Sequence, residues 1–106
     1  MAKSERSGKI QTVLGLIEPV DLGITMTHEH VLIDLSCYFV APEEASERWY
    51  IDAPFTMEIR GNIGKRWSYN KDYQLMIDEK VQTEEVYKFY LAGGHSMVDT
   101  TSIGIG

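Results

Sequence analysis

The chain has 106 residues, of which 43% are hydrophobic and 25% charged, a composition that favours a globular domain over a disordered segment. Its 16 acidic and 10 basic residues give a net charge of -6, which disfavours nucleic-acid binding because contacts to phosphates need a basic patch. The single cysteine, Cys37, excludes an internal disulfide and favours a reducing compartment, the cytoplasm. Residues 1–9 show no secretory pattern, and no apolar run reaches the roughly 20 residues of a membrane span.

The first predicted elements are a hairpin over residues 8–23 and a strand over residues 24–35. The hairpin follows from β-branched residues interrupted by Gly15, and Pro19 and Gly23 favour a turn after it. Residues 24–35 show the clearest alternation in the chain. Strict alternation places four side chains on one face, those of Ile24, Met26, His28 and His30.

Residues 36–77 form a long loop and helix region without a sustained period. Pro42 could open a short helix that reaches about Tyr50, because proline is tolerated in the first turn. Glycines and a further proline punctuate the rest. So long a connection indicates either a functional loop or a wrong assignment.

A helix over residues 78–92 and a second strand over residues 96–101 complete the predicted elements. Asp78 is the expected N-cap, and Gly93 and Gly94 end the helix. The order strand, helix-containing crossover, strand predicts a βαβ unit with parallel strands. Two such strands alone leave both sheet edges open and most of each apolar face uncovered.

The sequence His28-Glu29-His30 carries the strongest chemical signal. In a strand, residues i and i+2 point the same way, with Cα atoms roughly 6.5–7 Å apart. Two imidazoles at that spacing can bind one ion, each through a nitrogen at about 2.0–2.1 Å if the ion is zinc. Chance occurrence of an isolated pair is the competing explanation, but the position at the end of a strand favours a site.

Both ends of the chain resemble the phosphotriesterase family of the amidohydrolase superfamily. The motifs are Gln11-Thr12-Val13-Leu14-Gly15 and Asp21 to His30 at one end, then Ala92-Gly93-Gly94, Val98-Asp99-Thr100-Thr101 and Gly104-Ile105-Gly106 at the other. They stand in the family's order, with a variable loop between them. The resemblance implies an α/β fold, the N-terminal portion of a (β/α)₈ TIM barrel, incomplete in this chain, so that residues 1–106 form a partial metal-dependent hydrolase domain.

The resemblance also implies a zinc-dependent hydrolase that cleaves phosphotriesters, lactones or related small-molecule esters through a metal-bound hydroxide. A complete family site holds two divalent metals, commonly zinc, and His28 and His30 match the pair that binds the more buried one. The remaining ligands, a carboxylated lysine, two histidines and an aspartate, lie on strands beyond Gly106. No catalytic residue is therefore identifiable in this chain, and we expect the chain alone to be inactive.

Other residues carry weaker predictions. Asp99 could be a metal ligand or the hydrogen-bond acceptor of a ligand, and the simpler interpretation is a carboxylate that fixes local hydrogen bonds. Glu29 faces away from the histidines by alternation and is expected to be an orienting or structural carboxylate and not a ligand. His95 is expected in a surface turn, and Cys37 as a buried or idle thiol. A set of loop aromatics could wall a pocket or anchor the loop itself: Trp49, Tyr50, Trp67, Tyr69 and Tyr73.

Two alternatives to a hydrolase stay open. One is a non-catalytic protein that associates through its exposed strand edges, including with other copies of itself. The other is a weak single-metal binding module built on His28 and His30. The sequence does not distinguish phosphotriester from lactone substrates, nor does it identify the metal.

Overall fold

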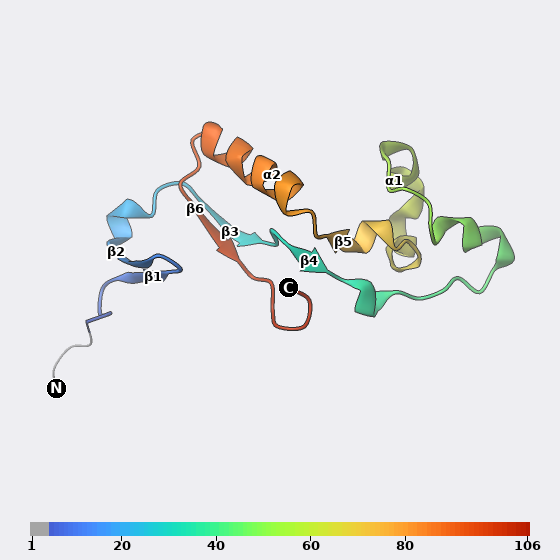
Figure 1. The fold of residues 1–106 in the computed structure, drawn as a ribbon, viewed down its shortest axis with the longest axis horizontal. Coiled ribbons are helices and arrows are strands. Elements are labelled where there is room, and N and C mark those ends of the chain that lie inside the picture. Colours follow the sequence, from blue (N-terminus) through green and yellow to red (C-terminus); the bar gives the residue numbers. More distant parts are fainter. Residues whose placement is uncertain (1–4) are drawn as a thin grey trace.

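The computed structural model describes residues 5–106 and shows an elongated molecule (Figure 1). Its extents are 64 × 35 × 21 Å and its radius of gyration is 18.9 Å, whereas a compact domain of this length has a radius of about 13 Å. Three two-stranded sheets follow one another along the long axis. The part of the Met1–Arg6 segment before residue 5, where no secretory pattern is predicted, lies outside the described residues.

The predicted N-terminal hairpin is formed by β1 (Ile10–Thr12) and β2 (Gly15–Ile17), which pair antiparallel with Ile10 opposite Ile17. The Thr12 hydroxyl closes the turn, because it donates to the Gly15 carbonyl at 2.8 Å and accepts from the Leu14 N–H at 3.1 Å. The hairpin lies at one end of the molecule (Figure 1). A short 3-10 helix, Pro19–Asp21, leads from it to the central sheet.

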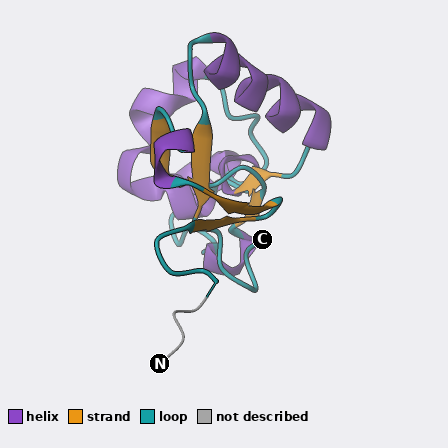
Figure 2. Cartoon of the chain, turned by 90° about the vertical axis from the view of Figure 1, so that its left-hand side faces the viewer, coloured by secondary structure: helices purple, strands orange, loops and turns teal. Residues whose placement is uncertain are grey.

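The centre is a βαβ unit of β3 (Thr25–Glu29), α2 (Glu79–Leu91) and β6 (Ser96–Asp99). The two strands are parallel, so the pairing predicted from the order of elements is confirmed. The Asp78 side chain caps α2 by accepting from the Val81 N–H at 3.1 Å. Helix α2 lies along one face of the β3–β6 sheet (Figures 1 and 2).

The single strand predicted over residues 24–35 is wrong in its extent, because the chain forms two separate strands there. After β3 it leaves the sheet at His30 and re-forms as β4 (Ile33–Asp34), which pairs antiparallel with β5 (Leu75–Met76). The break has a visible cause. The Val31 N–H donates to the Asp99 carboxylate at 3.2 Å. A side chain thus takes the place of the backbone carbonyl that would continue the sheet. The second strand likewise ends at Asp99, earlier than the predicted residue 101.

Residues 36–77, predicted as a long loop and helix region, fold into an ordered lobe. It contains α1 (Met57–Ile63) and four 3-10 helices: Ser36–Tyr38, Ala45–Tyr50, Gly64–Tyr69 and Asp72–Gln74. The helix predicted from Pro42 is thus a 3-10 helix that starts at Ala45. The β4–β5 pair, which lies between the central sheet and the lobe, had no sequence signal.

Asn70 organises the lobe. Its side chain is fully buried, and its amide donates to the carbonyls of Tyr50 at 2.7 Å and Ala53 at 2.8 Å. Its carbonyl accepts from the Tyr73 N–H at 2.6 Å. Two backbone stretches, residues 50–53 and 70–73, are therefore joined by one side chain, which satisfies polar groups that burial would otherwise leave unpaired.

The sheets, in contrast, leave apolar side chains uncovered. Ile24 is 64% exposed and Val98 45%. The total accessible surface is 8520 Å², against about 6,000 Å² expected for a compact monomer of this mass. The strands of residues 5–106 do not close a barrel. Within the same residues, no helix is both long and apolar enough to cross a membrane.

We expect Asn70→Ala to lower the free energy of unfolding of the lobe by about 3 kcal/mol, because three hydrogen bonds are lost and the buried carbonyl of Tyr50 and the partly buried carbonyl of Ala53 lose their donor. Urea unfolding followed by the fluorescence of Trp49 and Trp67, both in the lobe, measures this. The control is Asn62→Ala, an exposed position in α1, with an expected change below about 0.5 kcal/mol. Equal effects of the two substitutions would contradict the central role of Asn70.

Candidate metal centre

The register of β3 against β6 determines which side chains share a face. Met26 lies opposite Met97, and Glu29 lies opposite Asp99, so three steps along β3 match two steps along β6. This irregularity is a β-bulge with one extra residue in β3. Met97 and Asp99 share one face of β6, and Met26 and Glu29 therefore share that face on β3.

The predicted strict alternation, with Ile24 and Met26 on the face of the histidines, is therefore wrong. Met26 and Glu29 line a cavity of about 200 Å³ against Val86 and Phe89 of α2, and His30, which follows the end of β3, reaches the same cavity. His28 is adjacent to Glu29 and points to the opposite face. The register separates Glu29 from His28, but Glu29 and His30 line the same cavity, so the prediction that Glu29 faces away from both histidines stays a prediction.

The two imidazoles lie close to one another at the carboxyl end of β3. The ring centres of His28 and His30 are 5.4 Å apart and the rings are inclined by 79°. A tetrahedral zinc ion binds each imidazole nitrogen at about 2.0–2.1 Å, which puts the centres of two rings on one ion about 5 Å apart. The separation of the two ring centres is thus compatible with a shared divalent ion.

Two imidazoles do not complete a coordination sphere. Within residues 5–106 no group of three or more histidine, cysteine or carboxylate side chains lies close enough to hold an ion. A stable site needs three or four protein ligands. The described part of the chain therefore contains no complete metal site, and His28 and His30 are candidate ligands only.

His30 is held by residues at the end of β6. Its Nδ1 lies 2.9 Å from the Thr101 hydroxyl. Asp99 accepts from the backbone N–H groups of Thr101 at 2.8 Å and Val31 at 3.2 Å, so its carboxylate joins the two strand ends. This places Asp99 as a carboxylate that fixes hydrogen bonds, one of the two predicted roles.

The pKa of the Asp99 carboxyl lies below its ordinary value. The main causes are hydrogen bonds from the hydroxyl and the backbone N–H of Thr101, which outweigh the opposing effect of burial, and the Val31 N–H and the charge of His30 lower the pKa by smaller amounts. Asp99 is therefore ionised throughout the pH range in which an ordinary histidine titrates. The carboxylate acts only as a hydrogen-bond acceptor there.

A cavity of about 460 Å³ extends from His30 towards the lobe. Ile33 and Leu35 line it from the side of β4, and Phe55 and Tyr73 from the lobe. The last two rings contact each other edge to face, with centres 4.8 Å apart. Of the predicted pocket aromatics, Tyr73 lies in this cavity. Phe55 was missed, and its position after Pro54 in an irregular segment carries no signal for a pocket.

The other predicted aromatics anchor the lobe. Trp49 stacks on Tyr50 with ring centres 3.9 Å apart, and Trp67 contacts Tyr38 at 6.0 Å and Tyr73 at 6.3 Å. Tyr69 is half-buried in the same lobe. The alternative interpretation, a loop anchored by its own aromatics, describes most of this set.

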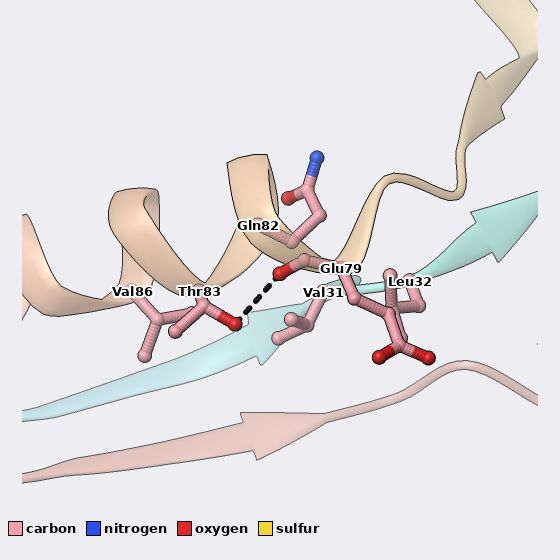
Figure 3. Close-up of a pocket in the computed structure, with 6 residues that line it drawn as sticks. All are labelled: Val31, Leu32, Glu79, Gln82, Thr83 and Val86. Atoms are coloured by element: carbon pink, nitrogen blue, oxygen red, sulfur yellow. Dashed lines mark hydrogen bonds between the residues drawn. The ribbon is translucent and has the colours of Figure 1, made fainter.

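A further groove, of about 330 Å³, lies between α2 and the segment that follows β3 (Figure 3). Its lining is formed by Val31, Leu32, Glu79, Gln82, Thr83 and Val86. The Thr83 hydroxyl donates to the Glu79 carbonyl at 2.6 Å within the helix. The lining is mainly apolar and lacks a titratable pair, so this groove shows no catalytic arrangement.

The two remaining candidates lie away from the histidine pair. His95 is exposed at the turn before β6, as predicted, and its ring lies against Gly23, where a Cβ atom would come within 2.6 Å of it. Gly23 also has a φ of 63°, so glycine is required there on two grounds. Cys37 is a free, exposed thiol, so the expectation of a buried one is wrong.

The chain contains a parallel βαβ segment with two potential metal ligands at the carboxyl end of its first strand. This arrangement is typical of α/β barrels. The sequence profile of the phosphotriesterase family matches residues 8–106. The chain therefore belongs to the phosphotriesterase family, as its sequence motifs predict.

Several known proteins and one solved structure are similar to this chain over most of its length. N-acetyltaurine hydrolases of Xenopus tropicalis and Homo sapiens are 38% and 37% identical, over 96% of this chain and 29% of theirs. A crystal structure of a resiniferatoxin-binding protein from Rhodobacter sphaeroides superimposes with a TM-score of 0.87 at 37% identity, over 95% of this chain and 28% of that one. The chain thus spans under a third of the length of these relatives.

Proposed function

We propose that His28 and His30 bind one divalent metal ion, commonly zinc, in the active site of a hydrolase. The observation that carries this proposal is the 5.4 Å separation of two inclined imidazole rings at the carboxyl end of a parallel strand. Membership of the phosphotriesterase family supports it. We further propose that β3 and β6 are the first two strands of an eight-stranded barrel, with the other ligands supplied by later strands.

The proposed reaction is hydrolysis of an ester-like bond in a small molecule. A divalent ion in this position would polarise the phosphoryl or carbonyl oxygen under attack and lower the pKa of a water molecule. The substrate classes are phosphotriesters, lactones and related esters. The names of the curated relatives add a compound with an N-acetyl amide, whose carbonyl is open to the same attack.

The residues of this chain have defined tasks in that reaction. His28 and His30 hold the ion, and the Asp99 carboxylate ties the end of β3 to the end of β6. Phe55 and Tyr73 form an apolar wall of the cavity that starts at His30. Such a wall would exclude water and accept an apolar part of a substrate.

We expect the 106-residue chain to bind zinc weakly, with one ion per chain, because only two imidazoles coordinate it. Isothermal titration calorimetry measures the affinity. His28→Ala and His30→Ala should each weaken binding at least tenfold. His95→Ala is the matched control and should bind as the unaltered chain does. Loss of binding in all three variants alike, or in none, would contradict the assignment.

We expect no hydrolysis by the isolated chain above the rate in buffer, since the rest of the metal centre is missing from residues 5–106. The assay uses a phosphotriester, a lactone and N-acetyltaurine, each with added zinc. The full-length hydrolase of Xenopus tropicalis is the positive control for the last substrate. Turnover that disappears with chelator and in His28→Ala would show that this chain needs no further ligands.

A second function is favoured by the uncovered faces of the sheet. We propose, as the alternative, that the chain associates with other copies of itself through the exposed edges and outer face of β3 and β6. Val98 lies on the face turned away from α2, because its neighbours Met97 and Asp99 share the face on which Met97 lines the cavity against α2. Exposed apolar faces and unpaired strand edges promote such pairing.

Size-exclusion chromatography with light scattering tests the association. We expect a mass above the 12.1 kDa of one chain that grows with concentration. Val98→Lys should reduce it, because a charge on this face opposes its burial. Val13→Lys, at a fully exposed position in the hairpin turn, is the control without effect. A strictly monomeric chain at all concentrations would rule out the association.

A further inference from the structure

We propose that Thr101 is a positioning residue that holds His30 in the Nδ1–H tautomer, with the Asp99 carboxylate as the acceptor that orients the Thr101 hydroxyl. The Nε2 lone pair of His30 is then free for a metal ion. The role in metal binding rests on the proposed function above, whereas the tautomer itself is a property of the metal-free chain.

The assignment follows from counting protons. The Nδ1 of His30 and the Oγ1 of Thr101 are 2.9 Å apart, so one proton lies between them. It belongs either to the imidazole or to the hydroxyl. The carboxylate of Asp99 is ionised at neutral pH and can only accept, and it already accepts from the backbone N–H of Thr101 at 2.8 Å. The hydroxyl of the same residue lies near this carboxylate, and we infer that its proton is directed there, in agreement with the lowered pKa of Asp99. With the hydroxyl proton directed to Asp99, the imidazole must supply the proton at Nδ1.

The position of Thr101 is fixed from two further sides. A Cβ atom at Gly106 would lie 2.6 Å from the Thr101 methyl, so the methyl fills the space beside this glycine and the hydroxyl is turned elsewhere. Asp99 also accepts from the N–H of Val31, the residue directly after His30. The imidazole and its backbone are therefore both tied to the same carboxylate.

The two histidines differ in this respect. Within the described part of the chain, the His28 ring shares an edge contact with His30 and has no side-chain hydrogen bond of its own. A metal-binding histidine whose second nitrogen donates to an oxygen has a fixed tautomer and ring orientation. His30 is thus the ligand already arranged for an ion, and His28 would adjust to it.

Nitrogen-15 NMR of the histidine rings, on the 106-residue chain without metal at a pH above the titration of histidine, reads the tautomers directly. We expect the Nδ1–H form at His30. Thr101→Val, which keeps the shape and removes the hydroxyl, should shift His30 to the Nε2–H form that free histidine prefers. Thr101→Ser should restore Nδ1–H. His28 and His95 are internal controls and should not change.

Zinc titration of the same variants gives the second readout. Thr101→Val should lower the affinity at least tenfold, and Thr101→Ser should recover most of it. If Thr101→Val changes the backbone amide spectrum as a whole, Thr101→Ala replaces it and should likewise move His30 towards Nε2–H, because it also removes the hydroxyl.

The outcomes separate this proposal from the metal site itself. An Nε2–H tautomer at His30 in the unaltered chain, or an unchanged tautomer in Thr101→Val, overturns the role of Thr101. The expected tautomers without any zinc binding support the hydrogen-bond assignment and overturn the metal site instead.

Discussion

The parallel pairing of β3 with β6 is the constraint on which the rest of the structure depends. It brings residues about 70 positions apart in the sequence to one strand end, where the Thr100 N–H donates to the Glu29 carbonyl at 2.9 Å. The Asp99 carboxylate extends this contact beyond the last regular pair. Without the pairing, His30 would have no hydroxyl beside its ring, and the loop after β6 would not return to β4, where the Ile105 carbonyl accepts from the Asp34 N–H.

Two parts of the molecule are stabilised in different ways. The lobe of residues 36–77 is held by buried amides and stacked rings, because its irregular backbone offers few regular hydrogen bonds. The β3–β6 sheet is held by backbone pairing across its bulge and has only one helix to cover it. Its remaining apolar surface is typical of a sheet that packs against further elements, in agreement with the share of each relative that this chain spans.

The sequence was most informative where a regular period or a short cap determines the structure. The helix after Asp78, the parallel crossover and the neighbouring histidines all follow from local spacing. The lobe could not be predicted, because a role such as that of Asn70 depends on backbone segments up to 20 residues away. The break after His30 was equally hidden, since the carboxylate that causes it belongs to a distant strand. Thr101 has no distinguishing feature in the sequence, although the motif that contains it was recognised.

The bulge in β3 lets two side chains that must face opposite sides of the sheet stand close together in the sequence. In a regular strand, Met26 and His28 would project to the same face. The side chain that packs against α2 would then lie beside the imidazole. One extra residue rotates the strand by half a turn between them. A side chain that packs against α2 and an imidazole on the opposite face are thereby specified within three consecutive positions of a strand of only five residues.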